Sequence, residues 1–160
     1  MTRISARGAL KILFWATEGA NWKTGWDIQN ERSDPCFQQW YGITCDEEGH
    51  ILSIRLPNNN LVGYLPVEFS RDALDHLQEL DLSSNYLSGS VPSTMSRLVG
   101  LRVLRLDRNF LTGLVPATLS SLIQLEYLEL QGNQLTPGVN GRVVPDAVQA
   151  LAYGQCHIIA

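Results

Sequence analysis

Cysteines and histidines are the residues of this chain whose chemistry first suggests a site. Cys36 and Cys45 lie close together in a segment rich in Asp, Gly, Gln and aromatic residues. No second cysteine or histidine pair stands nearby to complete a zinc site. A local disulfide is therefore expected, and it implies an oxidising compartment. Closing a loop of this length would stabilise the fold by about 2–3 kcal/mol in the chain-entropy model.

The remaining reactive residue types do not form a recognisable catalytic pattern. Cys156 lies near an apolar terminus, where a buried thiol is expected rather than a reactive one. His50, His76 and His157 are far from one another and from any cysteine spacing, so they are interpreted as surface residues. No phosphate-binding Gly-x-x-x-x-Gly-Lys motif and no supported Ser-His-Asp set is present. We therefore expect no catalysis, no bound metal and no cofactor.

Charge and hydropathy narrow the classes of partner. Twelve basic residues stand against sixteen acidic ones, for a net charge of −4, which argues against a nucleic acid or an anionic membrane as the main partner. No stretch approaches the roughly 18 apolar residues needed to insert into a bilayer. The apolar segment 9–16 is interrupted by Lys11 and is interpreted as an amphipathic helix, because it makes an unconvincing signal peptide.

An internal repeat is the strongest pattern in the chain. The segment 77–92 recurs as 101–116 with Leu, Asn, Gly and Pro at matching positions, a third copy begins at Leu125, and a degenerate copy begins at Ile51. Within a copy, Leu80 and Leu82 alternate with Asp81, so both leucines should point inward from a short strand. No single copy can bury its leucines alone, and neighbouring coils must stack to share one core.

The other fixed positions predict how each coil turns. Four asparagines follow the strands at the corner of the coil, and stacked amides there can satisfy main-chain groups of two coils; they are Asn59, Asn85, Asn109 and Asn133. Gly63, Gly89 and Gly113, which follow the first three of these asparagines, allow a tight bend. Prolines then set the start of a short helical segment whose apolar residues close the core.

This pattern closely resembles the plant-type leucine-rich repeat, with its Leu-x-Gly-x-x-Pro signature after the asparagine. The resemblance implies an α/β solenoid, a right-handed leucine-rich-repeat superhelix with a short parallel concave sheet and a helical N-terminal cap. Residues 1–50, containing Asp34-Pro35-Cys36 and Trp40-Tyr41-Gly42-Ile43-Thr44-Cys45, look like that family's cap. Residues 51–160 then form about four repeats with an incomplete terminal coil, in one continuous domain. The cap tryptophans Trp22, Trp26 and Trp40 are expected to pack on the first coil, with a sugar-binding platform as the alternative.

Several features depart from the family pattern. Residues 70–73 widen the first repeat, and residues 137–141 are an insertion in the fourth. A fifth strand begins near Cys156, and no C-terminal cap motif follows it. Either this strand is the cap, or the sequence belongs to something longer, or a partner covers the end.

The outward strand positions form the candidate binding surface. One column alternates in charge through Arg55, Asp81, Arg105 and Glu129. An ion-pair ladder that keeps the sheet soluble, worth about 0.2–1 kcal/mol per pair, is the favoured interpretation of that column. Arg and Tyr are also preferred anchors at interfaces. The expected partner-binding residues are Arg55, Glu79, Asp81, Arg102, Val103, Arg105, Arg108, Glu126, Tyr127 and Glu129. Tyr86 and Phe110 should stack on the flank.

Two functions remain open from the sequence. The first is a non-catalytic recognition module in an extracellular or other oxidising compartment, with a protein or peptide as the expected partner and a cell-wall glycan as the second choice. The resemblance implies relatives such as receptor-kinase ectodomains and polygalacturonase-inhibiting proteins. The second is a small structural subunit or scaffold in a larger complex. The small size of the strand surface, well below the roughly 800 Å² per partner of a standard interface, favours the second.

Overall fold

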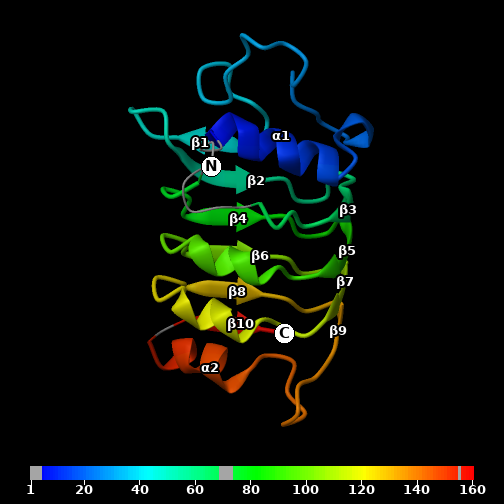
Figure 1. Ribbon diagram of the computed structural model, residues 1–160, viewed down its shortest axis with the longest axis vertical. Helices are drawn as coiled ribbons and strands as arrows, with labels where there is room; N and C mark the ends of the chain where they lie inside the picture. Colours follow the sequence, from blue (N-terminus) through cyan, green and yellow to red (C-terminus); the bar gives the residue numbers. More distant parts are fainter. Residues whose placement is uncertain (1–4, 69–73, 155) are drawn as a thin grey trace.

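The chain forms a stack of coils that follow one another along a single axis (Figure 1). The computed structural model describes residues 5–68, 74–154 and 156–160, so the widened segment at 70–73 lies outside the described residues. Each coil contributes a strand to one sheet, and several described coils also contribute a strand to a second sheet and a short helical segment on a third side. This arrangement confirms the expected leucine-rich-repeat solenoid.

The main sheet has six strands in the order β1, β2, β4, β6, β8 and β10. They comprise Ile43–Cys45 (β1), Ile51–Arg55 (β2), Glu79–Asp81 (β4), Val103–Arg105 (β6), Tyr127–Glu129 (β8) and His157–Ile159 (β10). The strands from β2 to β10 are parallel, as expected, and β10 confirms the fifth strand. β1 pairs antiparallel to β2, which corrects the expectation of a wholly parallel sheet. The physical reason is the short loop between them, which permits only a hairpin.

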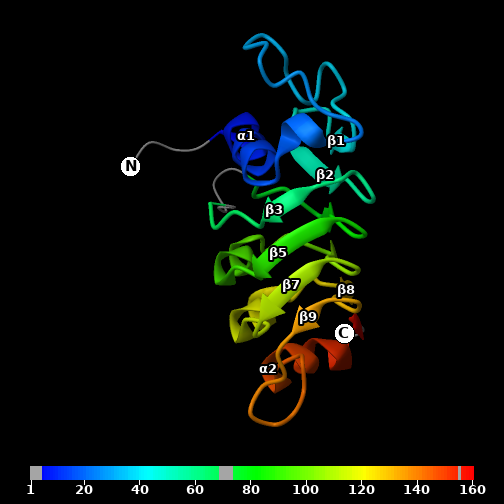
Figure 2. The same cartoon turned by 90° about the vertical axis from the view of Figure 1, so that its right-hand side faces the viewer.

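A second parallel sheet lies beside the first, and the sequence analysis did not anticipate it (Figure 2). Its strands are Val62–Tyr64 (β3), Tyr86–Ser90 (β5), Phe110–Gly113 (β7) and Gln134–Leu135 (β9). Glycine is required at one of these positions for two reasons. Gly63 has φ +126°, and a Cβ on it would lie 2.1 Å from the carbonyl oxygen of Ala16. The first coil can therefore approach the N-terminal helix only with glycine at this position.

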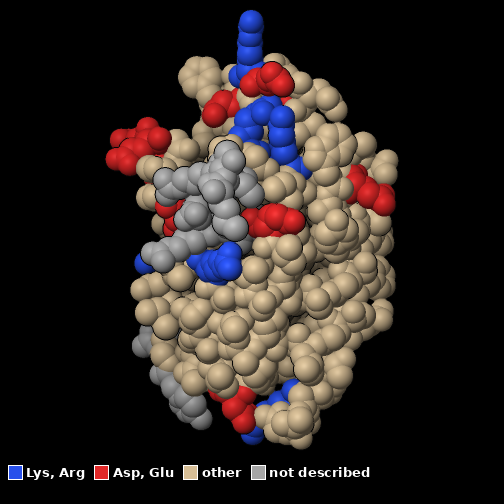
Figure 3. All heavy atoms as spheres, in the orientation of Figure 1, with Lys and Arg blue, Asp and Glu red and all other residues tan. Residues whose placement is uncertain are grey.

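Short helical segments form the third side; the first three of them begin directly after prolines, as expected, and the fourth continues from the third. They are Ser93–Arg97 (η2), Ala117–Ser121 (η3), Asp146–Gln149 (α2) and Ala150–Gly154 (η4). Met95 and Leu119 point from the middle pair into the core and are fully buried. Viewed from this side, charged side chains gather over the cap and the last coil, while the middle coils are largely uncharged (Figure 3).

The core and the asparagine ladder follow the predicted phase of the repeat. Leu80, Leu104 and Leu128 pair in register across β4, β6 and β8, and all three are fully buried. The amide of Asn109 accepts a hydrogen bond from the backbone N–H of Leu87 and donates to the carbonyl oxygens of Leu82 and Leu106. Asn85 and Asn133 make equivalent bonds between coils, while Asn59 accepts from the backbone N–H and donates to the carbonyl oxygen of Thr24 in the cap. These amides satisfy buried backbone groups where the strands end.

The N-terminal cap covers the open end of this core. Helix α1 (Ala6–Ala16) buries Leu10, Leu13 and Phe14 and is followed by the short helix η1 (Gly19–Asn21). Three tryptophans are 5–7% exposed, and each indole N–H donates to a hydrogen-bond acceptor inside the cap. Because these tryptophan rings are covered, the packing interpretation holds and the sugar-platform alternative does not.

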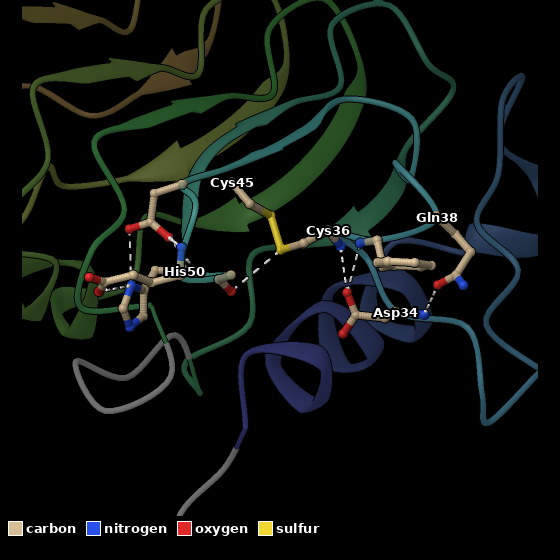
Figure 4. The surroundings of a disulfide bond; sticks show 9 residues. Asp34, Cys36, Gln38, Cys45 and His50 are labelled. Atoms are coloured by element: carbon tan, nitrogen blue, oxygen red, sulfur yellow. Dashed lines mark hydrogen bonds and ion pairs between the residues drawn. A yellow bond between two sulfur atoms is a disulfide. The ribbon is translucent and has the colours of Figure 1, made fainter.

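A disulfide between Cys36 and Cys45 ties the cap loop to β1, as expected (Figure 4). On the loop side, one carboxylate oxygen of Asp34 accepts hydrogen bonds from the backbone N–H groups of Cys36 and Phe37, both at 2.9 Å. On the strand side, β1 leads directly into the turn that carries His50. The disulfide therefore fixes the position of that turn relative to the cap.

Candidate functional site

The outward side of the six-stranded sheet, here called the strand face, carries the expected binding residues. Pairing in register places Arg55, Asp81, Arg105 and Glu129 in one row across the coils. A second row contains Glu79, Val103 and Tyr127, and the structure extends it to His157 on β10. The ring of His157 stacks on that of Tyr127 at 5.3 Å between centroids. The sequence analysis identified the strand of His157 but did not include its side chain in the face.

Ion pairs hold part of the strand face together. One guanidinium nitrogen of Arg55 lies 2.6 Å from the carboxylate of Glu79, which raises the pKa of Arg55. Arg105 reaches two neighbouring coils, with its Nε 3.0 Å from Glu129 and a terminal nitrogen 3.9 Å from Asp81. The predicted alternation of charge therefore forms ion pairs, although Arg55 pairs diagonally with Glu79 rather than with Asp81 directly across.

Two acidic residues expected in the binding set are too covered to be offered to a partner. The side chains of Glu79 and Asp81 are only 15% and 11% exposed. The reason is the length of the arginines on adjacent coils, whose guanidinium groups lie over the shorter carboxylates. We conclude that Glu79 and Asp81 orient Arg55 and Arg105, which are themselves more exposed.

The accessible part of the strand face lies on the third and fourth coils. Arg102 and Glu126 are both more than half exposed and lie 3.5 Å apart. Tyr127 is 40% exposed, and Val103 is half-buried beside it. Arg108 is exposed as expected, but it follows β6 with a φ of +53° and so does not lie on the strand itself. The accessible residues thus place one unburied cation, Arg102, beside the ring of Tyr127, while Arg108 lies farther along the third coil, next to Gly132 of the fourth.

Asp107 is a buried carboxyl group of the strand face that the sequence analysis missed. Its side chain is 5% exposed, and one carboxylate oxygen has no hydrogen-bond partner. Burial raises the pKa of Asp107, the negative charge of Glu129 raises it further, and Arg108 at 3.8 Å opposes the change. The 24-residue period could have identified this position, because it aligns Asp107 with Ser83 and Gln131, which are uncharged, in the neighbouring coils.

Replacing Asp107 with Asn should stabilise the protein at neutral pH. The buried Oε1 of Gln131, at the same position of the next coil, also lacks a partner, and an amide at 107 brings a donor and no charge. We expect a gain of about 0.5–1.5 kcal/mol in the free energy of unfolding at pH 7. Urea denaturation followed by circular dichroism measures it.

The pH dependence provides the check on this explanation. Because the folded state raises the pKa of Asp107, it holds the proton more tightly than the unfolded state does. The Asp107 contribution to stability is therefore largest at acidic pH and is lost as the pH rises through the raised pKa. The gain in unfolding free energy from Asp107→Asn should therefore become smaller as the pH is lowered toward about 4, the ordinary pKa of an Asp side chain. An advantage that does not change with pH would contradict the role assigned to the charge.

A hollow of about 800 Å³ lies at the C-terminal end of the strand face. Its lining includes Leu125 and Tyr127 from the fourth coil, together with Cys156 and His157 from the last one. Cys156 is buried, as expected, and burial raises the pKa of its thiol. The hollow continues the accessible surface from Tyr127 toward β10.

Two further aromatic pairs involve neighbouring coils. Tyr86 and Phe110 stack on the second sheet at 6.1 Å, as expected, and each is about half exposed. His50 and His76 stack at 3.9 Å between ring centroids, whereas the sequence analysis treated them as isolated surface residues. The expectation that they are isolated from each other was wrong. These histidines occupy the same position of adjacent coils, immediately before the first inward residue of each strand segment.

The repeat register, the asparagine ladder and the outward strand face together define a repeat solenoid that presents one side of its sheet. The family model described as "Leucine rich repeat" matches residues 50–109 and 75–135. The chain therefore belongs to the leucine-rich repeat family. Among the helices that the structure describes, none is both long and apolar enough to cross a membrane.

Plant receptor proteins are among the relatives. A probable leucine-rich repeat receptor-like protein kinase of Arabidopsis thaliana is 44% identical over 71 residues, which is 44% of this chain and 6% of that protein. The crystal structure of PEPR1 with AtPEP1 superposes with a TM-score of 0.71 at 33% identity, over 81% of this chain and 18% of that one. The plant peptide hormone receptor RGFR1 in complex with RGF2 gives a TM-score of 0.58 at 27% identity, over 75% and 22% of the two chains. The chain thus spans only a small part of these relatives.

Proposed function

We propose that this chain is a non-catalytic recognition module that binds a peptide or an extended protein segment through the strand face. The exposed cation Arg102 beside Tyr127, with a second exposed cation, Arg108, farther along the same coil, is the observation that carries the proposal. Arg and Tyr are enriched among residues that dominate binding energy. The names of PEPR1–AtPEP1 and of the peptide hormone receptor RGFR1 support the same class of ligand.

The dimensions of the strand face favour a peptide over a folded domain. Six strands at a spacing of about 4.8 Å span about 24 Å, and each strand is short. An extended peptide rises about 3.4 Å per residue, so about seven residues would cross the sheet perpendicular to the strands. The area of the strand face is below that of a standard protein–protein interface, so a globular partner would also have to contact the flanks of the solenoid.

The charge of the accessible surface indicates the chemistry of the ligand. Arg102 and Arg108 are only loosely paired, at 3.5 Å from Glu126 and 3.8 Å from Asp107, and both are more than half exposed. A carboxylate of the ligand can therefore bind Arg102 without breaking a buried ion pair, whereas binding Arg108 would compete with its contact to the buried Asp107. An acidic side chain close to an apolar one, placed against Tyr127, fits this surface best.

The setting proposed for this binding is extracellular. The disulfide needs an oxidising compartment, and the matched relatives are named as receptor-like proteins. The kinase in one relative's name is not carried over, because the match covers 6% of that protein. We further propose that residues 1–50 act as the cap of one continuous domain whose repeats occupy 51–160.

A structural subunit of a larger complex remains the second candidate. The observation that favours it is the small area of the strand face, which is below that of a standard interface. Size measurement in native extract separates the two functions, since a subunit should not run as a free monomer. A glycan ligand is the third choice, supported by the stacked, half-exposed pair Tyr86–Phe110.

Photo-crosslinking from position 127 tests the proposal. A photoreactive amino acid in place of Tyr127 should capture an acidic peptide from extracellular fluid of the tissue that expresses the chain, because Tyr127 lies beside the exposed Arg102. The matched control carries the same probe at Thr118, which is exposed on η3 on the helical side. Mass spectrometry identifies the captured species. Equal capture from positions 127 and 118 would exclude the strand face as the binding surface.

A further inference from the structure

His50 and His76 are brought together by the repeat rather than by proximity in the sequence. Each precedes the first inward residue of its coil, Ile51 or Leu77, and the next two coils carry Gly100 and Gln124 at the same position. Neighbouring coils lie about 4.8 Å apart. Two imidazoles at this position must therefore meet, and the planes of their rings are within 5° of parallel.

A carboxylate is fixed beside this histidine pair. Asp46 lies in the turn between β1 and β2, where one oxygen accepts hydrogen bonds from the backbone N–H groups of Glu48 at 3.0 Å and His50 at 2.8 Å. The other oxygen lies 3.0 Å from Nδ1 of His50. Figure 4 shows His50 on the strand side of the disulfide, whose Cys45 directly precedes Asp46.

We propose that Asp46, His50 and His76 bind a divalent transition-metal ion of the zinc type. One ligand atom from each residue lies within 4.8 Å of the other two. Two imidazoles and one carboxylate are a common protein ligand set for zinc, with bonds of about 2.0–2.2 Å. A carboxylate oxygen of Glu48 lies 3.6 Å from Nδ1 of His50, and the Glu48 side chain is 80% exposed, so it can complete a fourth position.

The ring geometry determines how such a site assembles. In a stacked pair the nitrogen lone pairs lie in parallel planes, so both rings cannot point at one ion without turning. The side chains of His50 and His76 are 38% and 46% exposed, which leaves both rings free to rotate. Asp46 is already held in place by the backbone. Binding of the ion therefore requires the two histidine rings to leave their stack and turn toward the ion, so the complete site forms only when the ion is bound.

The consequence is a link between the cap and the repeats. Asp46 and His50 belong to the hairpin that the disulfide ties to the cap, while His76 belongs to the next coil. An ion held by all three would join these two parts at the edge of the strand face. This inference is independent of the peptide ligand proposed above.

Zinc titration of the untagged, disulfide-intact protein tests the site. A histidine tag must be absent, because it would bind the metal itself. We expect saturable 1:1 binding of Zn²⁺ in calorimetry, reversed by a chelator. His50→Ala and His76→Ala should each weaken binding at least tenfold, and Asp46→Asn should weaken it in the same direction. In NMR spectra the ring signals of His50 and His76 should shift together with zinc.

His157→Ala is the matched control, since His157 is also partly stacked and exposed but lies on β10. This variant should bind zinc as the wild type does. Circular dichroism checks that each variant is folded, which is expected because the substituted histidines are surface residues. Zinc binding that survives both His50→Ala and His76→Ala, or that is lost in His157→Ala, overturns the proposal. The absence of saturable binding up to 1 mM zinc overturns it as well.

Discussion

Leu104→Ala is expected to lower the free energy of unfolding by about 2–5 kcal/mol. Leu104 is fully buried on β6, between Leu80 and Leu128 of the adjacent coils. Truncation removes apolar contact with both neighbours and leaves a cavity that the stacked backbone cannot close. Because small domains have only about 5–15 kcal/mol of stability, this single change should move the urea midpoint substantially.

Leu114→Ala provides the matched control for this measurement. Leu114 is 58% exposed, so the same chemical change should cost less than about 0.5 kcal/mol. Two signals should be followed together: circular dichroism reports on all coils, while fluorescence of the buried cap tryptophans reports on the cap. Equal costs for Leu104→Ala and Leu114→Ala would show that the assigned inward phase of the repeat is wrong.

Reversing the arginines of the third coil should remove partner binding. In Arg102→Glu/Arg105→Glu/Arg108→Glu, three cations that face the proposed peptide become anions. Loss of a dominant interface residue typically costs about 2 kcal/mol or more, so we expect capture from position 127 to fall at least about thirtyfold. The dissociation constant of the identified peptide, measured by calorimetry or surface plasmon resonance, gives this fold-change directly.

The structure shows that this triple variant also changes stability. Arg105 lies between Asp81 and Glu129, so a glutamate at 105 would place three carboxylates together and lower the melting temperature. The double variant Arg102→Glu/Arg108→Glu keeps Arg105 between its two carboxylates, but it places new carboxylates beside Glu126 and the buried Asp107, so a smaller loss of stability is expected and circular dichroism must show that the variant is folded. Arg97→Glu/Arg142→Glu, which reverses two exposed arginines away from the strand face, is the charge-matched control. Undiminished binding in the folded double variant would remove the third coil from the site.

The candidate site could be predicted from the sequence only in part. The rows of Arg55, Arg105 and Tyr127 follow from the repeat period, because a strand alternates its side chains between two sides. The period does not determine how far each side chain is covered. Whether Asp81 is accessible depends on the reach of Arg105 from the next coil, which only the packed structure decides.

The sequence by itself determined the solenoid. A 24-residue period with inward leucines, corner asparagines and prolines allows one way of burying the apolar residues, and each requirement is local to a coil or its neighbour. The Cys36–Cys45 pair was predictable for the same reason, since its partners are close in the chain.

Only the tertiary structure decided the contacts between coils that lie outside the core. The antiparallel strand β1, the second sheet, the buried charge of Asp107 and the stack of His50 on His76 all arise where one coil meets the next. These contacts depend on side-chain length, hydrogen bonding and solvent exclusion at a spacing of about 4.8 Å, which a pattern of apolar residues does not encode.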